Sequence, residues 1–201
     1  MLRMGLTGGI ASGKSAVAAM LREMGFSVLE ADVVAHKLIE PGQPAHDEVL
    51  QEFGADLCDA SGRIDRVRLA SIVFANPAKL ARLNAIIHPR VEAIVSRQFA
   101  EWQKSGVRDA AFVEAALLVE VGIDEKLDGL VVTYCEPEQQ LERLRARGMS
   151  EIEAKRRIAA QLPLEEKLRK ATETIDCSGS IEETRTQVQA LAAKLRKRSS
   201  G

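Results

Sequence analysis

Residues 5–15 read GLTGGIASGKS, and the apolar segment 2–7 leads into this glycine-rich stretch. Glycine weakens a helix and interrupts a strand, so its concentration here indicates a segment that needs an unobstructed backbone. The pattern G-x-x-x-x-G-K-[ST], which joins a strand to a helix and binds nucleotide phosphates, is matched by Gly8, Gly13, Lys14 and Ser15. A chance match is disfavoured, because 2–7 is typical of a buried parallel strand and 16–24 of a helix.

Each part of this loop has a chemical role. Backbone N–H groups surround phosphate oxygens, and side chains at the glycines would block that approach. Lys14 offers a positive charge to the β- and γ-phosphates, Ser15 offers a hydroxyl to Mg²⁺, and a helix that begins near Lys14 directs its dipole at the same anions. We therefore expect a nucleotide and Mg²⁺ as ligands. The loop residues expected to bind the nucleotide are Gly8, Gly9, Ala11, Ser12, Gly13, Lys14, Ser15 and Ala16.

The composition is that of an ordinary globular protein. The chain has 201 residues, 46% of them hydrophobic and 28% charged, and a formal net charge of -1. This balance gives no indication of a nucleic-acid partner, and no apolar run is long enough to predict a membrane span. Three scattered cysteines and the absence of a signal-peptide pattern favour a reduced, cytoplasmic setting.

The rest of the chain alternates between strand and helix patterns, which predicts an α/β fold with a parallel sheet. Further strands are expected at 26–32, 109–115, 129–135 and 173–177. Helices are expected at 33–40, 44–53, 65–75, 77–104 with a break near His88–Pro89, 137–160 with an interruption, 163–171 and 181–198. The long helical stretch between the second and third strands exceeds what one crossover needs and predicts a substrate-binding insertion.

Asp32 is a candidate catalytic residue, because it lies at the end of the expected second strand, and ligands of open parallel sheets bind beyond the carboxyl ends of the strands. A carboxylate there could orient a substrate hydroxyl, accept its proton, or hold Mg²⁺ through water. The alternative is a helix N-cap, a position that aspartate favours.

Arginines cluster before and after Gly148. Arg143 and Arg147 are four residues apart and share a helix face, while Arg156 and Arg157 follow in the next segment. Such cations could close over transferring phosphates. The alternative is a solvated surface neutralised by the neighbouring glutamates.

Taken together, these segments resemble the dephospho-CoA kinase family over nearly the whole chain. The segments that carry the resemblance are GLTGGIASGKS, LEADVVAHKLIEPGQPAH, FGADLCDASGRIDRVRLASIVF, HPRV, EAALLVE, RGMSEIEAKRRIAAQ and IDCSGS. The resemblance implies a single three-layer P-loop NTPase domain with a five-stranded parallel sheet. It also implies a core (about 1–32, 106–140 and 172–201), a helical CoA-binding subdomain (about 33–105) and a helical lid (about 141–171).

The family resemblance also implies an activity: a monomeric enzyme transfers the ATP γ-phosphate to the 3′-hydroxyl of dephospho-CoA, the last step of coenzyme A synthesis. It implies Asp32 as catalytic base, with Lys14 and the lid arginine Arg147 also catalytic. Arg143 would bind the nucleotide, and His88 and Leu117 would join Asp32 in binding the substrate.

The chain departs from the family pattern at a few positions. Ala11 replaces a glycine, Glu30 an aspartate, Ala116 a proline, and Cys177 an asparagine near the adenine. A positive φ at Ala11 would cost about 1 kcal/mol. Two rival functions are a nucleoside monophosphate kinase and a GTPase-like switch. The long insertion and His88–Pro89 disfavour the first, and the lack of an Asn-Lys-x-Asp segment disfavours the second.

Overall fold

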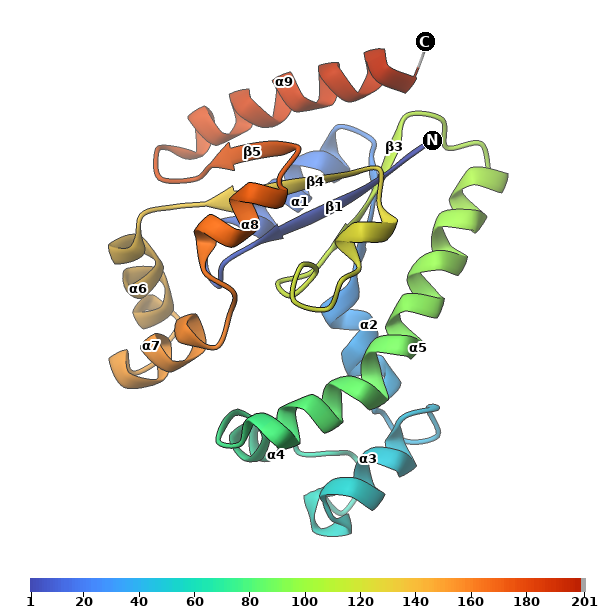
Figure 1. The fold of residues 1–201 in the computed structure, drawn as a ribbon, viewed down its shortest axis with the longest axis vertical. Coiled ribbons are helices and arrows are strands. Elements are labelled where there is room, and N and C mark those ends of the chain that lie inside the picture. The colour runs from blue at the N-terminus through green and yellow to red at the C-terminus, as the bar shows by residue number, and fades with distance from the viewer. Residues whose placement is uncertain (200–201) are drawn as a thin grey trace. The chain divides into compact units, whose positions relative to one another are not determined.

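The computed structural model of the chain describes residues 1–199 (Figure 1). The chain divides into two compact units, one formed by Met1–Glu30 and the chain from Gln98 onward, the other by Ala31–Arg97. Within the described residues, the first unit contains a five-stranded sheet in the order β2-β3-β1-β4-β5, and every neighbouring pair is parallel. Its strands are β1 (Leu2–Gly8), β2 (Ser27–Glu30), β3 (Ala110–Glu114), β4 (Gly129–Tyr134) and β5 (Glu173–Asp176). The expected parallel α/β sheet is confirmed.

The second strand is shorter than expected. It ends at Glu30, and α2 (Ala31–Leu38) begins immediately, so Asp32 lies in the first helical turn rather than at the end of a strand. An N-cap role for Asp32 is therefore wrong, because the cap precedes the helix. Alanine favours a helix, and an acidic side chain in the first turn complements the helix dipole.

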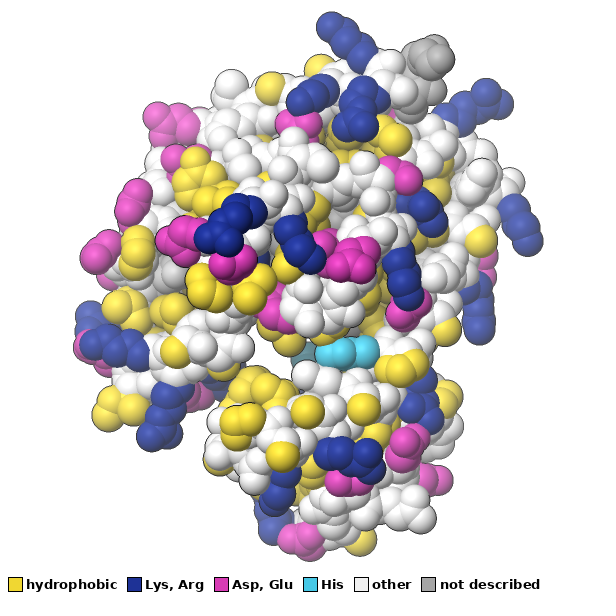
Figure 2. Space-filling model, viewed as in Figure 1, with side chains coloured by type: hydrophobic (Ala, Val, Ile, Leu, Met, Phe, Trp, Pro, Cys, Tyr) yellow, Lys and Arg dark blue, Asp and Glu magenta, His cyan; other side chains and the backbone are white. Residues whose placement is uncertain are grey.

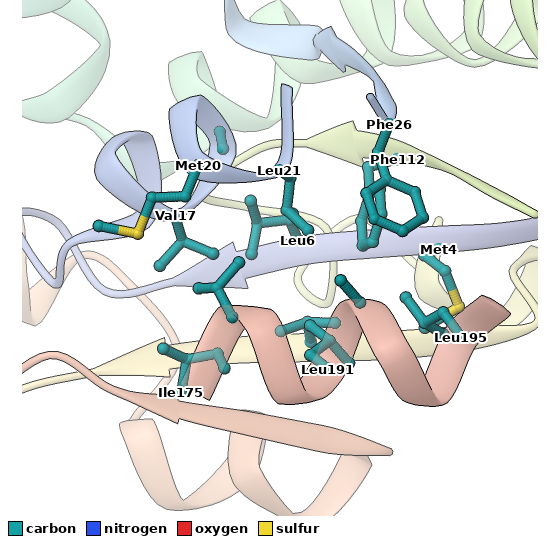
Figure 3. Close-up of a cluster of buried hydrophobic side chains, with 14 of the residues drawn as sticks. Met4, Leu6, Val17, Met20, Leu21, Phe26, Phe112, Ile175, Leu191 and Leu195 are labelled. Carbon is teal, nitrogen blue, oxygen red and sulfur yellow. The ribbon is translucent and has the colours of Figure 1, made fainter. Parts of the chain in front are cut away.

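The helices of the first unit cover both faces of the sheet. They are α1 (Lys14–Glu23), η2 (Asp124–Lys126), α6 (Pro137–Ala146), α7 (Glu151–Ala159), α8 (Leu164–Lys170), α9 (Ile181–Ser199) and the end of α5 (Pro77–Lys104). On one face α1 and α9 bury their apolar sides against β1, as Leu21, Leu191 and Leu195 show (Figure 3). On the other face α8 lies against β4 (Figure 1). Among residues 1–199, no helix has both the length and the apolar composition to cross a membrane.

The named elements of the second unit are helices, and Cys58 and Ile64 form an isolated antiparallel bridge. The unit contains α2, α3 (His46–Phe53), η1 (Ala55–Leu57), α4 (Arg66–Phe74) and most of α5. The expected break near His88–Pro89 is wrong, because α5 continues through Pro89 and only changes direction along its length (Figure 1). A proline inside a helix removes one hydrogen bond and causes a kink. The Arg90 guanidinium donates to the Ile86 carbonyl at 2.5 Å, beside that lost bond.

His46 is a buried polar residue of this unit. Its Nδ1 lies 2.8 Å from Asp47 Oδ1 and its Nε2 lies 2.8 Å from the Gly62 carbonyl oxygen. Both partners are acceptors, so both bonds form only when both ring nitrogens carry protons. The pKa of His46 is raised above 6.5. The hydrogen bond to Asp47 is the largest cause, and the hydrogen bond to the Gly62 carbonyl is the next.

This raised pKa predicts a stability that depends on pH. The stabilising contribution of protonated His46 is complete below its unfolded-state pKa and is lost as the pH rises through the folded-state pKa. The urea concentration at the unfolding midpoint should therefore fall less steeply with rising pH, between pH 5.5 and 8.5, in His46→Gln than in the wild-type protein. His36→Gln, at an exposed position on α2, is the control and should keep the wild-type slope. An unchanged slope in His46→Gln would contradict this assignment.

Candidate phosphate-binding site

The glycine-rich loop follows β1 directly and leads into α1. Gly13 has φ 96° and precedes Lys14, the first residue of the helix. A Cβ at Gly13 would lie 2.6 Å from Cys177 Sγ, and one at Gly8 would collide with Thr133. Glycine is required at both positions, by close approach as well as by backbone angle. The first N–H groups of a helix have no carbonyl group four residues earlier to bond, which makes this end of α1 suited to anions.

A buried carboxylate lies against the two side chains that complete the motif. Lys14 Nζ is 2.8 Å from Glu114 Oε1, and Ser15 Oγ donates to the same oxygen at 3.3 Å. The side chains of Lys14 and Glu114 are only 13% and 5% exposed. Glu114 reaches this position because β3 pairs with β1, with Glu114 opposite Leu6, and ends at the same edge of the sheet.

The sequence patterns did not predict Glu114 as a residue of the site. The available signal was an acidic residue at the end of the apolar segment 109–115, because parallel strands deliver their carboxyl ends to one edge. Its second oxygen, Oε2, lies 3.9 Å from Arg22 Nη2, and Arg22 also contacts Glu30 at 2.6 Å. Glu30, which pairs in register with Glu114, is thus part of an ion-pair network.

The remaining loop residues support its shape. Ser12 is buried and its hydroxyl pairs with Thr133 Oγ1 at 2.8 Å, while its N–H donates to the Gly9 carbonyl at 3.1 Å. The N–H of Ala16 donates to the Gly13 carbonyl at 3.0 Å, within the first turn of the helix. Ala11 has φ 59°, the one positive φ outside glycine among the described residues. The cost expected for this alanine, about 1 kcal/mol, therefore applies.

Cys177 packs against the loop, and its thiol is not in a reactive environment. It is buried, its Sγ lies beside Gly13, and burial raises the pKa of the thiol to about 11. Cys135 is also buried, and burial raises the pKa of its thiol. Protonated, enclosed thiols are poor nucleophiles, so both cysteines act here in packing.

Arg143 and Arg147, expected on one face, have different surroundings. The Arg143 guanidinium donates to the Ala11 carbonyl at 3.1 Å and to the Cys177 carbonyl at 2.7 Å. Arg147 follows α6, is exposed, and has no hydrogen-bond or ion-pair partner for its side chain among residues 1–199. Two backbone carbonyls therefore hold the Arg143 guanidinium against the loop and the end of β5.

The turn between α6 and α7 matches the expected interruption. Gly148 has φ 82°, and Ser150 caps α7 by accepting a hydrogen bond from the Glu153 N–H. Arg145 and Glu151 form an ion pair across this turn. The turn can therefore change its backbone angles at Gly148, but an ion pair links the two helices.

The expected substrate-binding residues belong to different parts of the chain. Asp32 is an exposed residue of α2, and His88 is a half-buried residue of α5, where burial lowers the pKa of the imidazole. Both lie in the helical unit. Leu117 follows β3 in the first unit and is half-buried. Their roles remain predictions.

The oxygen atoms at the loop suit a hard cation. Ser15 Oγ and the Glu114 carboxylate are 3.3 Å apart, and Mg²⁺ binds through one or two such ligands together with water and substrate phosphates. Within residues 1–199, no group of three or more histidine, cysteine, aspartate or glutamate side chains could hold a metal ion.

Comparison with known proteins supplies a family. A sequence model described as dephospho-CoA kinase matches residues 2–183. The chain is 44% identical over 191 residues to the dephospho-CoA kinase of Carboxydothermus hydrogenoformans, and the alignment covers 94% of this chain and 92% of that relative.

Two solved structures are similar to this chain over nearly its whole length. TT1252 from Thermus thermophilus superposes with a TM-score of 0.81 at 34% identity, covering 96% of this chain and 97% of that one. A dephospho-CoA kinase from Campylobacter jejuni superposes with a TM-score of 0.72 at 29% identity, covering 98% of each chain.

The largely buried Lys14–Glu114 pair generates a prediction. Lys14→Ala leaves a buried carboxylate short of its closest cation, so it should lower the free energy of unfolding by about 1–3 kcal/mol. Lys14→Ala/Glu114→Gln should regain most of that loss. Chemical denaturation measures both variants.

The matched control is Arg169→Ala, which breaks an exposed pair with Glu166 at the same 2.8 Å separation. That change should cost no more than about 0.5 kcal/mol. A Lys14→Ala variant as stable as the Arg169→Ala variant would show that the buried pair contributes nothing.

Proposed function

The chain belongs to the dephospho-CoA kinase family, and from this premise we propose that it transfers the γ-phosphoryl group of ATP to the 3′-hydroxyl of dephospho-CoA, completing coenzyme A. The observation that carries the proposal is the convergence of Lys14, Ser15 and Glu114 at the loop between β1 and α1. A cation, a hydroxyl and a carboxylate beside an exposed helix N-terminus are the groups that a phosphoryl-transfer site needs.

Binding of ATP would redistribute the contacts of Lys14. The β- and γ-phosphates would accept hydrogen bonds from the loop N–H groups and from Lys14, which releases Glu114 from its ion pair. Ser15 and Glu114 would then hold Mg²⁺, which when bound neutralises charge on the phosphates. Arg143, already anchored on Ala11, would contact the nucleotide from α6.

The acceptor hydroxyl needs a base, and Asp32 is the residue proposed for it. The 3′-oxygen attacks the γ-phosphorus, the bond to the β–γ bridging oxygen breaks, and the hydroxyl proton passes to the Asp32 carboxylate. Asp32 lies two residues after Glu30, which pairs in register with Glu114. His88 and Leu117 are proposed as contacts of dephospho-CoA.

Asp32→Asn should lower kcat by about 10²-fold or more, because an amide cannot accept the proton. ATP affinity should change little, since the loop is unaltered. Steady-state kinetics and nucleotide titration measure the two effects, with thermal unfolding as the control for folding. A variant that loses stability but keeps kcat would assign Asp32 a structural role in α2 instead.

Arg147 is proposed as the lid arginine that stabilises the transferring phosphoryl group. Arg147→Ala should lower kcat more than it raises the KM for dephospho-CoA, because the charge on the transferring group is greatest in the transition state. Arg145→Ala is the matched control two residues away, since Arg145 instead pairs with Glu151. Equal effects of the two substitutions would leave Arg147 as a solvated surface residue.

The proposal extends to partners and location. We propose a monomeric cytoplasmic enzyme without a nucleic-acid partner. The interspersed basic and acidic side chains over most of the face in Figure 2, together with the net charge of -1, support the absence of a nucleic-acid partner.

The test is ADP release from ATP and Mg²⁺ in the presence of dephospho-CoA, pantetheine compounds or nucleoside monophosphates. The expected result is rapid ADP release with dephospho-CoA alone and loss of that activity in Lys14→Ala. Turnover with a nucleoside monophosphate would favour that class of kinase. Slow hydrolysis that no acceptor accelerates would instead indicate a switch.

A further inference from the structure

Two glutamine side chains hold the phosphate loop at Ile10. Gln161 Oε1 accepts a hydrogen bond from the Ile10 N–H at 2.7 Å. Gln140 Nε2 donates to the Ile10 carbonyl oxygen at 2.8 Å. Gln140 lies on α6, while Gln161 lies between α7 and α8. Ile10 of the loop is therefore hydrogen-bonded to one residue that precedes α7 in the sequence and one that follows it.

The two contacts have opposite chemistry. A backbone N–H requires an acceptor and a carbonyl requires a donor. Each glutamine carries both kinds of atom, yet each presents to Ile10 the one that its partner requires. Gln140 also contacts the loop sterically, since a Cβ at Gly9 would lie 2.5 Å from Gln140 Nε2.

The neighbouring residue shows why the loop needs such support. Ala11 adopts φ 59°, an unfavourable conformation for an L-residue that persists only where the surroundings impose it. The two carbonyl groups that flank the Ala11 α-carbon both accept hydrogen bonds from α6. The Ile10 carbonyl accepts one from Gln140, and the Ala11 carbonyl accepts one from Arg143. Gln140 and Arg143 are three residues apart and share a face of α6.

We propose that Gln140 and Gln161 are positioning residues that hold the phosphate loop, through Ile10, in the shape that binds the β- and γ-phosphates. They act on the loop backbone and need not touch the nucleotide. Through these hydrogen bonds, the position of the α6–α8 segment affects the conformation of the loop. This inference rests on the proposed function in taking ATP as the ligand, but it does not depend on dephospho-CoA as the acceptor.

A matched pair of substitutions tests the proposal, Gln140→Glu and Gln161→Glu. Each preserves side-chain shape and places one added negative charge beside the same residue, so repulsion of the nucleotide is similar in both. Gln161→Glu keeps an acceptor for the Ile10 N–H, whereas Gln140→Glu places a carboxylate against the Ile10 carbonyl. At pH 8, Gln140→Glu should bind ATP about 10-fold more weakly than Gln161→Glu, as expected when a hydrogen bond is replaced by an unsatisfied acceptor.

The measurement is titration calorimetry with ATP, ADP and AMP and without any acceptor, so a failure of dephospho-CoA turnover leaves it unaffected. The loss in Gln140→Glu should be confined to ATP and ADP, because AMP lacks the phosphates that the loop binds. In the kinetic assay, Gln140→Glu should raise the KM for ATP while kcat at saturating ATP changes less.

Three outcomes with this pair of substitutions would overturn the proposal. Equal weakening of ATP binding by both substitutions would indicate charge alone, and no weakening by either would remove the positioning role. Equal loss of AMP binding would indicate general damage to the fold. If Gln140→Glu does not fold, Gln140→Met removes the donor without a charge, and wild-type affinity for ATP in that variant would equally overturn the proposal.

Discussion

The parallel pairing of β1 with β3 on one side and β4 on the other is the constraint on which the site depends. Because β1 is the central strand, its carboxyl end lies between those of two neighbours, and the phosphate loop must form there. The register sets Leu6 opposite Glu114 and Gly8 opposite Thr133. Glu114 consequently reaches Lys14 and Ser15, and Thr133 reaches Ser12. This strand register therefore places the partners of the phosphate-loop residues beside them.

The loop also depends on segments far away in the sequence. Its strained residue Ala11 is held by Arg143, and the preceding residue Ile10 by Gln140 and Gln161, all more than a hundred positions distant. Cys177 fills the space beside Gly13. Backbone strain at a functional site requires compensation by the surrounding structure. Here the segments that follow β4 supply that compensation to the phosphate loop.

Local patterns predicted the five strands, the helix after the loop and the turn at Gly148, because periodicity and glycine placement are properties of neighbouring residues. The motifs also predicted the family. The patterns missed Glu114 as a partner of Lys14 and the continuity of α5 through Pro89, which depend on strand pairing and helix packing. They also placed Asp32 in a strand, since extended and helical patterns overlap over so few residues.

Identification of the phosphorylated product tests the central claim most directly. The protein would be incubated with Mg²⁺, ATP and dephospho-CoA, and the product examined by phosphorus NMR and mass spectrometry. The expected result is one new phosphomonoester on the ribose 3′-oxygen for each ADP formed. Release of inorganic phosphate without that ester, or phosphorylation at another position of the acceptor, would contradict the claim.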